Sequence, residues 1–317
     1  KEDAVDAIKN ETSLPEPKAW DLLDRMISDG LLAETLHRNQ GTTEVVRFPY
    51  QRFGDHIIAR HLLAEHLNTD SETAVRRSFY VNRPLGQLFD LEGDNRRFAE
   101  PGLAEAIMVE FPQRVKRVND IPDNERELAF YIPKKRRYGA PLKDIFLDGL
   151  YWRSSDSFTE QTDDLVSFYL EELDERVQRE TFDVLVGLAS RPGHPYDADR
   201  LYGYLDDMEM AERDEQWSEY LRRTTDYSTV HRILKWVETA PVDEFSENTA
   251  QNAITLLSVL LTTTDRYLRD RVTHKLYLVG LAHPGLLFEE TLRTFSFNDP
   301  YVRERMLASC YGIAMSL

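Results

Sequence analysis

The chain has 317 residues, of which 41% are hydrophobic, 11% aromatic and 30% charged. Disordered chains lack this content of aliphatic and aromatic side chains, so we expect most of the chain to fold, and its length allows two compact units. The formal net charge is −17, and the stretch from Glu160 to Glu219, with 18 acidic and 5 basic side chains, alone carries −13. Duplex nucleic acid is bound mainly through Lys and Arg at its phosphates, so this charge argues against nucleic acid as a partner. The acidic stretch predicts a solvated helical face or, alternatively, a surface that meets a basic protein.

Cysteine usage and hydropathy favour a cytoplasmic location. Cys310 is the only cysteine, so we expect no disulfide within the chain and no cysteine-based metal site, and its apolar neighbours predict a buried structural thiol. No segment approaches the roughly 20 apolar residues that span a bilayer, and the opening residues lack an apolar signal segment, so we expect no membrane partner. The chain opens at Lys1 without an initiator Met and closes inside an apolar run, which we interpret as a fragment of a larger protein.

Residues 1–68 predict a winged-helix-like module of two helices, a β-hairpin and a third helix. Pro17 suits a first helical turn and Gly30 suits a left-handed helix end. Strand-like runs at residues 31–36 and 44–48 flank the turn signal at residues 39–41. The apolar side chains that follow recur at helical spacing from residue 51 to residue 67.

Residues 69–160 predict an irregular connector of short helices. Prolines interrupt this stretch at positions 84, 101, 112, 122, 133 and 141, leaving room for a short helix such as Gly102 to Phe111. The only basic cluster, residues 134–137, is interpreted as a solvated turn, with an anion or nucleic-acid contact as the alternative.

Residues 161–317 predict an α-solenoid of HEAT/TPR-like helical repeats. Leu165, Tyr169, Leu173 and Val177 form one apolar stripe at helical spacing. A second stripe, at positions 182, 185, 186 and 188, precedes a break at residues 191–195, after which Asp197 or Asp199 can cap the next helix. A late Asp-Pro pair at positions 299–300 predicts another helix start.

An internal echo supports the repeat interpretation. The pentapeptide Leu-Val-Gly-Leu-Ala occurs at residues 185–189 and again at residues 278–282, and a His-Pro pair follows each copy. The offset of 93 residues is about two periods of a HEAT-type repeat. Stacked helix pairs bury their apolar faces against their neighbours and leave a concave surface for binding.

The sequence predicts no catalytic, cofactor-binding or metal site. No Walker A motif, Gly-x-Gly-x-x-Gly, Gly-x-Ser-x-Gly or His-Glu-x-x-His is present. His56, His61 and His66 are five residues apart, so they point about 140° apart on a helix and cannot converge on one ion. His194 and His283 precede prolines and are interpreted as turn residues, and the paired carboxylates of the acidic stretch as helix-surface residues.

Protein binding is the chemistry that the remaining residues suit. Residues 265–271 form a mixed-charge patch at a predicted helix start, interpreted as salt-bridged packing or partner recognition. Aromatic residues at helical spacing are core residues by default but binding anchors where a concave surface exposes them. The candidate protein-binding residues are Trp217, Tyr220, Arg266, Arg269, Tyr301 and Arg303.

Several stretches resemble bacterial STAND proteins, the NACHT-like P-loop ATPases that include the antiviral (Avs) group. Residues 24–32 (DRMISDGLL) and 47–59 (RFPYQRFGDHIIA) resemble the winged helix that follows the ATPase core. The stretches that resemble their helical sensor region are residues 191–201 (RPGHPYDADRL), 265–270 (DRYLRD) and 299–305 (DPYVRER). The resemblance implies a parent protein with an effector domain and an ATP- and Mg²⁺-dependent core, both absent here. It further implies that the repeats sense a foreign (phage) protein and release self-oligomerisation of the parent.

Two other functions fit the same residues. A HEAT-like scaffold or adaptor could bind a host protein without any link to an ATPase. A regulator could bind nucleic acid through the winged helix, where Arg38, Arg47 and Arg52 lie near the wing, although the net charge of −17 argues against it.

Overall fold

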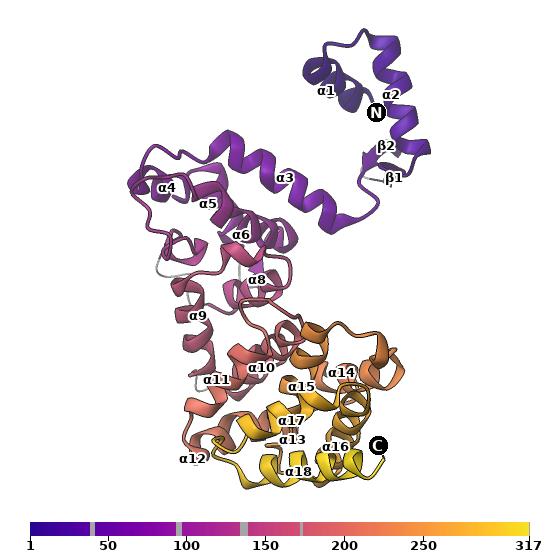
Figure 1. Ribbon diagram of the computed structural model, residues 1–317. Helices are drawn as coiled ribbons and strands as arrows, with labels where there is room; N and C mark the ends of the chain where they lie inside the picture. Colours follow the sequence, from indigo (N-terminus) through magenta and orange to yellow (C-terminus); the bar gives the residue numbers. More distant parts are fainter. Residues whose placement is uncertain (39–41, 93–96, 134–138, 172–173, 317) are drawn as a thin grey trace. The chain divides into compact units, whose positions relative to one another are not determined.

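The computed structural model describes residues 1–38, 42–92, 97–133, 139–171 and 174–316, and it is mainly helical (Figure 1). The chain divides into two compact units, Lys1–Gly149 and Leu150–Leu317. Within the described residues, no helix is both long enough and apolar enough to cross a membrane. The predominance of helices confirms the mainly helical fold class predicted from the sequence.

The first unit begins with the helix, helix, hairpin, helix order that the sequence predicts. These elements are α1 (Glu2–Thr12), α2 (Glu16–Ser28), β1 (Ala33–Arg38), β2 (Thr42–Arg47) and α3 (Gln51–His66). The strands pair antiparallel from Ala33 opposite Arg47 to Arg38 opposite Thr42, while the predicted turn at residues 39–41 lies outside the described residues.

Helix α2 ends at glycine as predicted. Gly30 has a φ of 73°, and its N–H donates to the carbonyl of Ile27 while the N–H of Leu31 donates to that of Met26. This pair of hydrogen bonds is a Schellman motif, which satisfies carbonyls that the helix end would leave free. The apolar face of the same helix buries Ala19 and Leu23 against Val5 of α1.

The rest of the first unit contains short helices around one longer helix. The elements are α4 (Glu72–Ser78), α5 (Pro84–Leu88), β3 (Leu91–Glu92), β4 (Arg97–Phe98), α6 (Pro101–Val115), η2 (Leu128–Phe130) and α8 (Ala140–Leu150). Helix α6 passes through Pro112, beyond the predicted end at Phe111. The helix is buried along most of its length, so packing outweighs the backbone hydrogen bond that a proline cannot donate. The basic cluster at residues 134–137 lies outside the described residues.

An aromatic cluster forms the core around α6. The ring of Phe79 meets those of Phe89 and Phe111 edge to face, with centroids 6.1 and 5.5 Å apart. The ring centroids of Phe89 and Phe98 lie 5.7 Å apart, and those of Phe111 and Tyr131 lie 5.1 Å apart. These rings tie together the short elements that the prolines separate.

Ion pairs join α3 to α6 along the face that contains His56, one of the three histidines that the sequence excludes as joint metal ligands. Arg52 lies 3.1 Å from Glu105, and both His56 and Arg60 lie 2.9 Å from oxygens of Glu110. Helices α3 and α6 therefore share an interface that crosses residue 68, the predicted end of the first module.

We expect acid to weaken the interface between α3 and α6 by protonating the carboxylate of Glu110. Burial of its carboxyl opposes ionisation, but hydrogen bonds from His56 and Arg60 outweigh this and lower the pKa below its usual 4.5. A carboxyl whose pKa is lowered by folding stabilises the folded state above pH 4.5. This contribution is lost as the pH falls through the pKa of the folded state. At pH 7 we expect Glu110→Gln to lower the free energy of unfolding by about 1 kcal/mol.

The difference between wild type and Glu110→Gln should shrink towards zero between pH 5 and about pH 3, measured by urea unfolding at each pH. Burial raises the pKa of the neighbouring Glu105. Ionisation of Glu105 therefore destabilises the fold as the pH rises, which is opposite to the contribution of Glu110. Comparing the two proteins removes this contribution, because both retain Glu105. A difference that stays constant down to pH 3 contradicts the assignment to Glu110.

All the regular elements among the described residues of the second unit are helices, joined by turns and loops. It contains η3 (Ser155–Ser157), α9 (Glu160–Leu170), α10 (Glu175–Ala189), α11 (Ala198–Asp207), α12 (Met210–Arg213), the π-helical turn η4 (Asp214–Ser218), α13 (Glu219–Arg222), α14 (Thr229–Thr239), η5 (Val242–Glu244), α15 (Glu247–Leu260), α16 (Arg266–Ala282), α17 (Pro284–Arg293) and α18 (Pro300–Ala314). Helices adjacent in sequence pack together, such as α9 with α10 and α15 with α16. Others pack across longer sequence distances, such as α10 with α14, α11 with α15 and α16 with α18.

Aspartates cap four of these helices, two of them at positions expected from the sequence; the fourth, Asp174, accepts from the N–H of Arg176 at the start of α10. Asp197 accepts from the N–H of Arg200 at the start of α11, and Asp299 accepts from that of Tyr301 at the start of α18. Asp265 does the same at the start of α16. The single stripe predicted from Leu165 to Val177 is wrong, because α9 ends at Leu170 and α10 begins at Glu175; Leu173 lies outside the described residues.

The repeated pentapeptide occupies the last turn of two helices, α10 and α16. Its glycine lies at a close helix contact in both copies: a Cβ on Gly187 would lie 2.3 Å from the Tyr151 hydroxyl, and one on Gly280 would lie 2.6 Å from Leu287. The connections then differ, because α17 starts at Pro284 immediately after His283, whereas α11 starts only at Ala198. The two glycines thus face different partners, Tyr151 in one copy and Leu287 in the other, and the turns that follow them differ as well.

Candidate functional site

Two of the predicted binding residues are core residues. Trp217 and Tyr220 are 0% and 4% exposed, and their rings pack against Phe182. The indole N–H of Trp217 donates to Thr262 Oγ1 at 2.7 Å, and the hydroxyl of Tyr220 donates to Asp183 at 3.0 Å. Core packing, the default interpretation of helical spacing, describes both rings, which are not available as surface anchors in this conformation.

The other four predicted residues lie at the starts of α16 and α18. Arg269 is buried, donates to the carbonyl of Thr263 at 3.1 Å, and lies 3.9 Å from the ring centroid of Tyr301. Tyr301 remains 46% exposed, and the side chains of Arg266 and Arg303 are exposed. The structure therefore brings Arg269 and Tyr301 together as a packed cation–π pair, which agrees with the packing interpretation of the mixed-charge patch.

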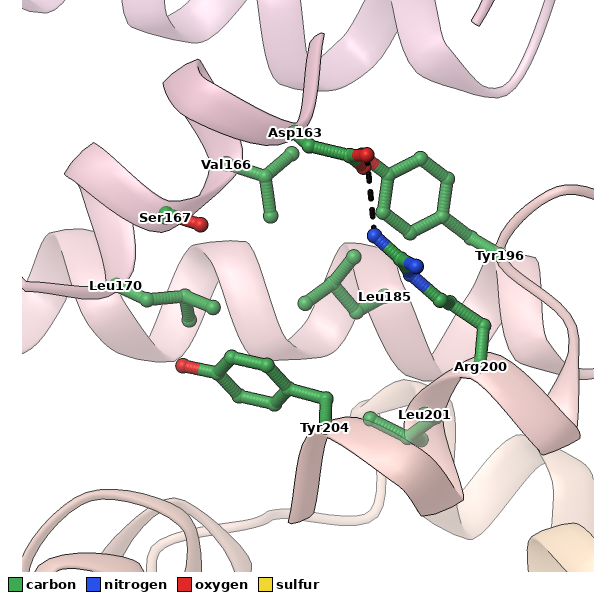
Figure 2. Close-up of a pocket in the computed structure, with 9 residues that line it drawn as sticks. All are labelled: Asp163, Val166, Ser167, Leu170, Leu185, Tyr196, Arg200, Leu201 and Tyr204. Carbon is green, nitrogen blue, oxygen red and sulfur yellow. Dashed lines mark hydrogen bonds and ion pairs between the residues drawn. The ribbon is translucent and has the colours of Figure 1, made fainter. Parts of the chain in front are cut away.

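A small pocket lies among α9, α10 and α11 (Figure 2). Its volume is about 50 Å³, and its lining residues are Asp163, Val166, Ser167, Leu170, Leu185, Tyr196, Arg200, Leu201 and Tyr204. Asp163 faces Arg200 at 3.0 Å and accepts a hydrogen bond from the hydroxyl of Tyr196. Asp163, Tyr196 and Arg200 bind one another at its edge, and most of the remaining wall is apolar, so this pocket has space only for a small, mainly apolar group.

A larger open groove lies between the C-terminal end of α10 and helix α14. We call it the arginine groove; it has a volume of about 390 Å³ and is lined by Tyr151, Gly187, Ser190, Arg191, Thr229, Arg232, Ile233 and Trp236. Both arginines and Trp236 are exposed. The absence of a side chain on Gly187 leaves the place that Tyr151 fills.

Hydrogen bonds position the two arginines of the groove. Arg191 donates to the backbone carbonyl of Tyr151 at 2.8 Å, and its guanidinium lies 5.4 Å from the centroid of that ring. Arg232 donates to Thr229 Oγ1 at 2.8 Å. Burial raises the pKa of the Tyr151 hydroxyl to about 12, so this ring stays neutral near pH 7.

The carboxylate beneath the groove is already engaged. Asp183 accepts hydrogen bonds from the hydroxyl of Tyr220 at 3.0 Å and from the N–H and hydroxyl of Thr229 at 3.0 and 2.6 Å. No carboxylate is among the lining residues of the groove. In the part of the chain that the structure describes, neither Arg191 nor Arg232 has an acidic side chain within ion-pair distance. The groove is therefore a local cationic site in a strongly acidic chain.

The sequence contains signals for this groove, but they lie in separate stretches of the chain. Arg191 lies in the predicted break at residues 191–195, and Trp236 is not among the predicted binding residues. The signal in α14 is the i, i+4 spacing of Arg232 and Trp236 on a helix whose opposite face is apolar. That face buries Ile233, Leu234 and Val237 and leaves the other two side chains exposed.

Titratable groups elsewhere serve packing and turns. His194 accepts a hydrogen bond from the N–H of Tyr196 through Nδ1, a local contact that fits its predicted turn role, whereas His283 Nε2 lies 2.8 Å from the distant carbonyl of Val242. Cys310 is half-buried beside Thr291, and burial raises the pKa of its thiol. Among the described residues, no group of three or more His, Cys, Asp or Glu side chains is arranged to hold a metal ion.

Comparison of the chain with protein-family models, with curated proteins and with solved structures finds no match. The function of the chain is therefore inferred from its own geometry.

Proposed function

We propose that the chain is the winged-helix and ligand-sensing portion of a STAND-type ATPase, in which the helical second unit recognises a foreign protein. The observation that carries the proposal is the arginine groove, an open surface site with an exposed tryptophan on a scaffold of packed helices. Aromatic and arginine side chains contribute most of the binding energy at many protein interfaces. The helix, helix, hairpin, helix order at the start of the chain supports the winged-helix part.

The mechanism is a population shift. A protein ligand that binds the second unit better in one conformation of the parent protein favours that conformation by its difference in affinity. The first unit would relay this change to an ATPase core, and the ion pairs between α3 and α6 would keep its helices moving together. ATP and Mg²⁺ would bind the core of the parent protein, and no residue of this chain is assigned to them.

Recovery of a phage protein from infected cells tests the proposal. The full-length parent protein is expected to retain a viral protein on affinity purification, and a version lacking residues 150–317 is expected to lose it. The coding sequence before Lys1 is expected to contain a Walker A motif. Its absence, with a host protein recovered instead of a viral one, would favour a scaffold or adaptor unconnected to an ATPase.

A further inference from the structure

Building on the proposed recognition function, we propose that the arginine groove binds a short acidic segment of the protein ligand. Carboxylates of the segment pair with Arg191 and Arg232, and an apolar or aromatic side chain beside them packs on Trp236. The ligand chemistry is thus one or two carboxylates adjoining a hydrophobic side chain.

Charge complementarity identifies the carboxylate part of the ligand. The chain carries a net charge of −17, and several of its described arginines form ion pairs with carboxylates, such as Arg223 with Glu175 and Arg305 with Asp270. Arg191 and Arg232 line one cavity, and the carboxylate beneath it, Asp183, is engaged by three donors from the chain itself. A guanidinium binds a carboxylate through two parallel N–H donors, so each of these arginines offers a specific site for an acidic side chain.

The two arginines are partly ordered before a ligand arrives. Arg191 is held by the backbone carbonyl of Tyr151 and Arg232 by the hydroxyl of Thr229. Thr229 is in turn fixed by Asp183. Side chains ordered in advance lose less conformational entropy on binding, which favours affinity.

Trp236 supplies the apolar part of the site. Its ring is 43% exposed and lies parallel to Phe245, with centroids 5.2 Å apart and an interplanar angle of 11°. This stacking holds one face of the indole against the chain. Trp236 also borders a small apolar pocket with Ile233, Val237 and Leu257, so hydrophobic surface continues directly from the groove.

The surroundings favour an acidic peptide over a nucleic acid. The stretch from Glu160 to Glu219, which includes Arg191, carries −13. A short peptide places its charges in the groove, and carboxylates farther away than about 8–10 Å are largely screened at physiological salt. A nucleic acid carries a phosphate on every nucleotide, so its backbone extends its charge over the acidic flanks.

Fluorescence anisotropy with short labelled peptides tests the proposal on residues 1–317. The probe is a peptide of sequence Glu-Glu-Tyr-Glu-Glu, compared with Gln-Gln-Tyr-Gln-Gln and with a short oligothymidylate. We expect the acidic peptide to bind, with an affinity that falls as salt is raised, and the glutamine peptide to bind about tenfold or more weakly, since charge-assisted hydrogen bonds are lost. No binding of the acidic peptide up to about 1 mM, or tighter binding of the oligothymidylate, overturns the proposal.

Matched variants locate the binding site. The double variant Arg191→Gln/Arg232→Gln is expected to weaken acidic-peptide binding about tenfold or more, and Arg191→Lys/Arg232→Lys to weaken it less, because lysine keeps the charge but loses the paired donors. The control Arg25→Gln/Arg117→Gln removes the same charge from exposed arginines outside the groove and should bind like wild type. Equal losses in the groove and control variants would show a general charge effect and overturn the site. Circular dichroism confirms that each variant is folded.

The same variants separate this inference from the proposed function. If the full-length parent with the groove variant still retains its viral protein, the acidic-segment site is wrong while the sensing function stands. If wild-type parent retains no viral protein but the acidic peptide binds residues 1–317 through the groove, the sensing function fails and the groove chemistry stands.

Discussion

Replacing Arg213 with methionine is expected to lower the free energy of unfolding of the second unit by about 3–5 kcal/mol. The side chain is 0% exposed and connects segments far apart in the sequence. It donates to the carbonyls of Leu205 and Asn298, lies 3.7 Å from Asp299, and its guanidinium lies 4.8 Å from the ring centroid of Phe297.

The expected loss arises from the groups that the substitution would leave behind. Methionine fills much of the volume but donates no hydrogen bond, so the buried carbonyl of Leu205 and the partly buried carbonyl of Asn298 lose a donor, and Asp299 loses its cation. Burial already raises the pKa of Asp299, which shows that its charge is poorly solvated there. Asp299 also caps α18, so its disturbance should loosen the start of that helix.

Urea unfolding, followed by circular dichroism and tryptophan fluorescence, measures the effect. Arg266→Met is the matched control, because that side chain is 85% exposed and should change stability by less than about 0.5 kcal/mol. Equal stabilities of the two variants would contradict the structural role assigned to Arg213.

The fold was predictable from the sequence wherever a local signal decides the structure. Gly30 ends α2, Asp197 and Asp299 cap their helices, and the alternation of strand-like runs gives the hairpin. Each of these features depends on backbone groups within a few residues, so composition and spacing are sufficient. The helical stripe across Leu165 to Val177 failed because apolar spacing continued through the end of α9 at Leu170.

The candidate site was not predictable in the same way, because it depends on contacts between distant residues. The arginine groove joins Tyr151, Gly187, Arg191 and Arg232, which come from three separate segments. Spacing within a helix reports which side chains share a face but not which face is covered by another helix. For this reason Trp217 and Arg269 were predicted at a binding surface, although tertiary packing buries both.

The second large effect is expected at Trp217, whose replacement with alanine should lower the free energy of unfolding by about 3–5 kcal/mol. The indole is 0% exposed and packs against Phe182 and Tyr220, with ring centroids 5.3 and 5.4 Å away. Alanine would leave a cavity that these rings fill only in part, and would remove the donor to Thr262. Trp217→Phe should cost less, because it keeps a ring and loses chiefly the hydrogen bond.

Trp217→Ala should also disturb the arginine groove, because the same core packs beneath it. Tyr220 contacts Trp217 and donates to Asp183, and Asp183 holds the Thr229 that positions Arg232. The matched control is Trp236→Ala: this indole is 43% exposed and stacks on one ring, so it should lose acidic-peptide binding at a much smaller cost in stability. Urea unfolding and peptide anisotropy on both variants separate the two roles. If Trp217→Ala were as stable as Trp236→Ala, the core beneath the groove would not be what holds Asp183 and its partners in place.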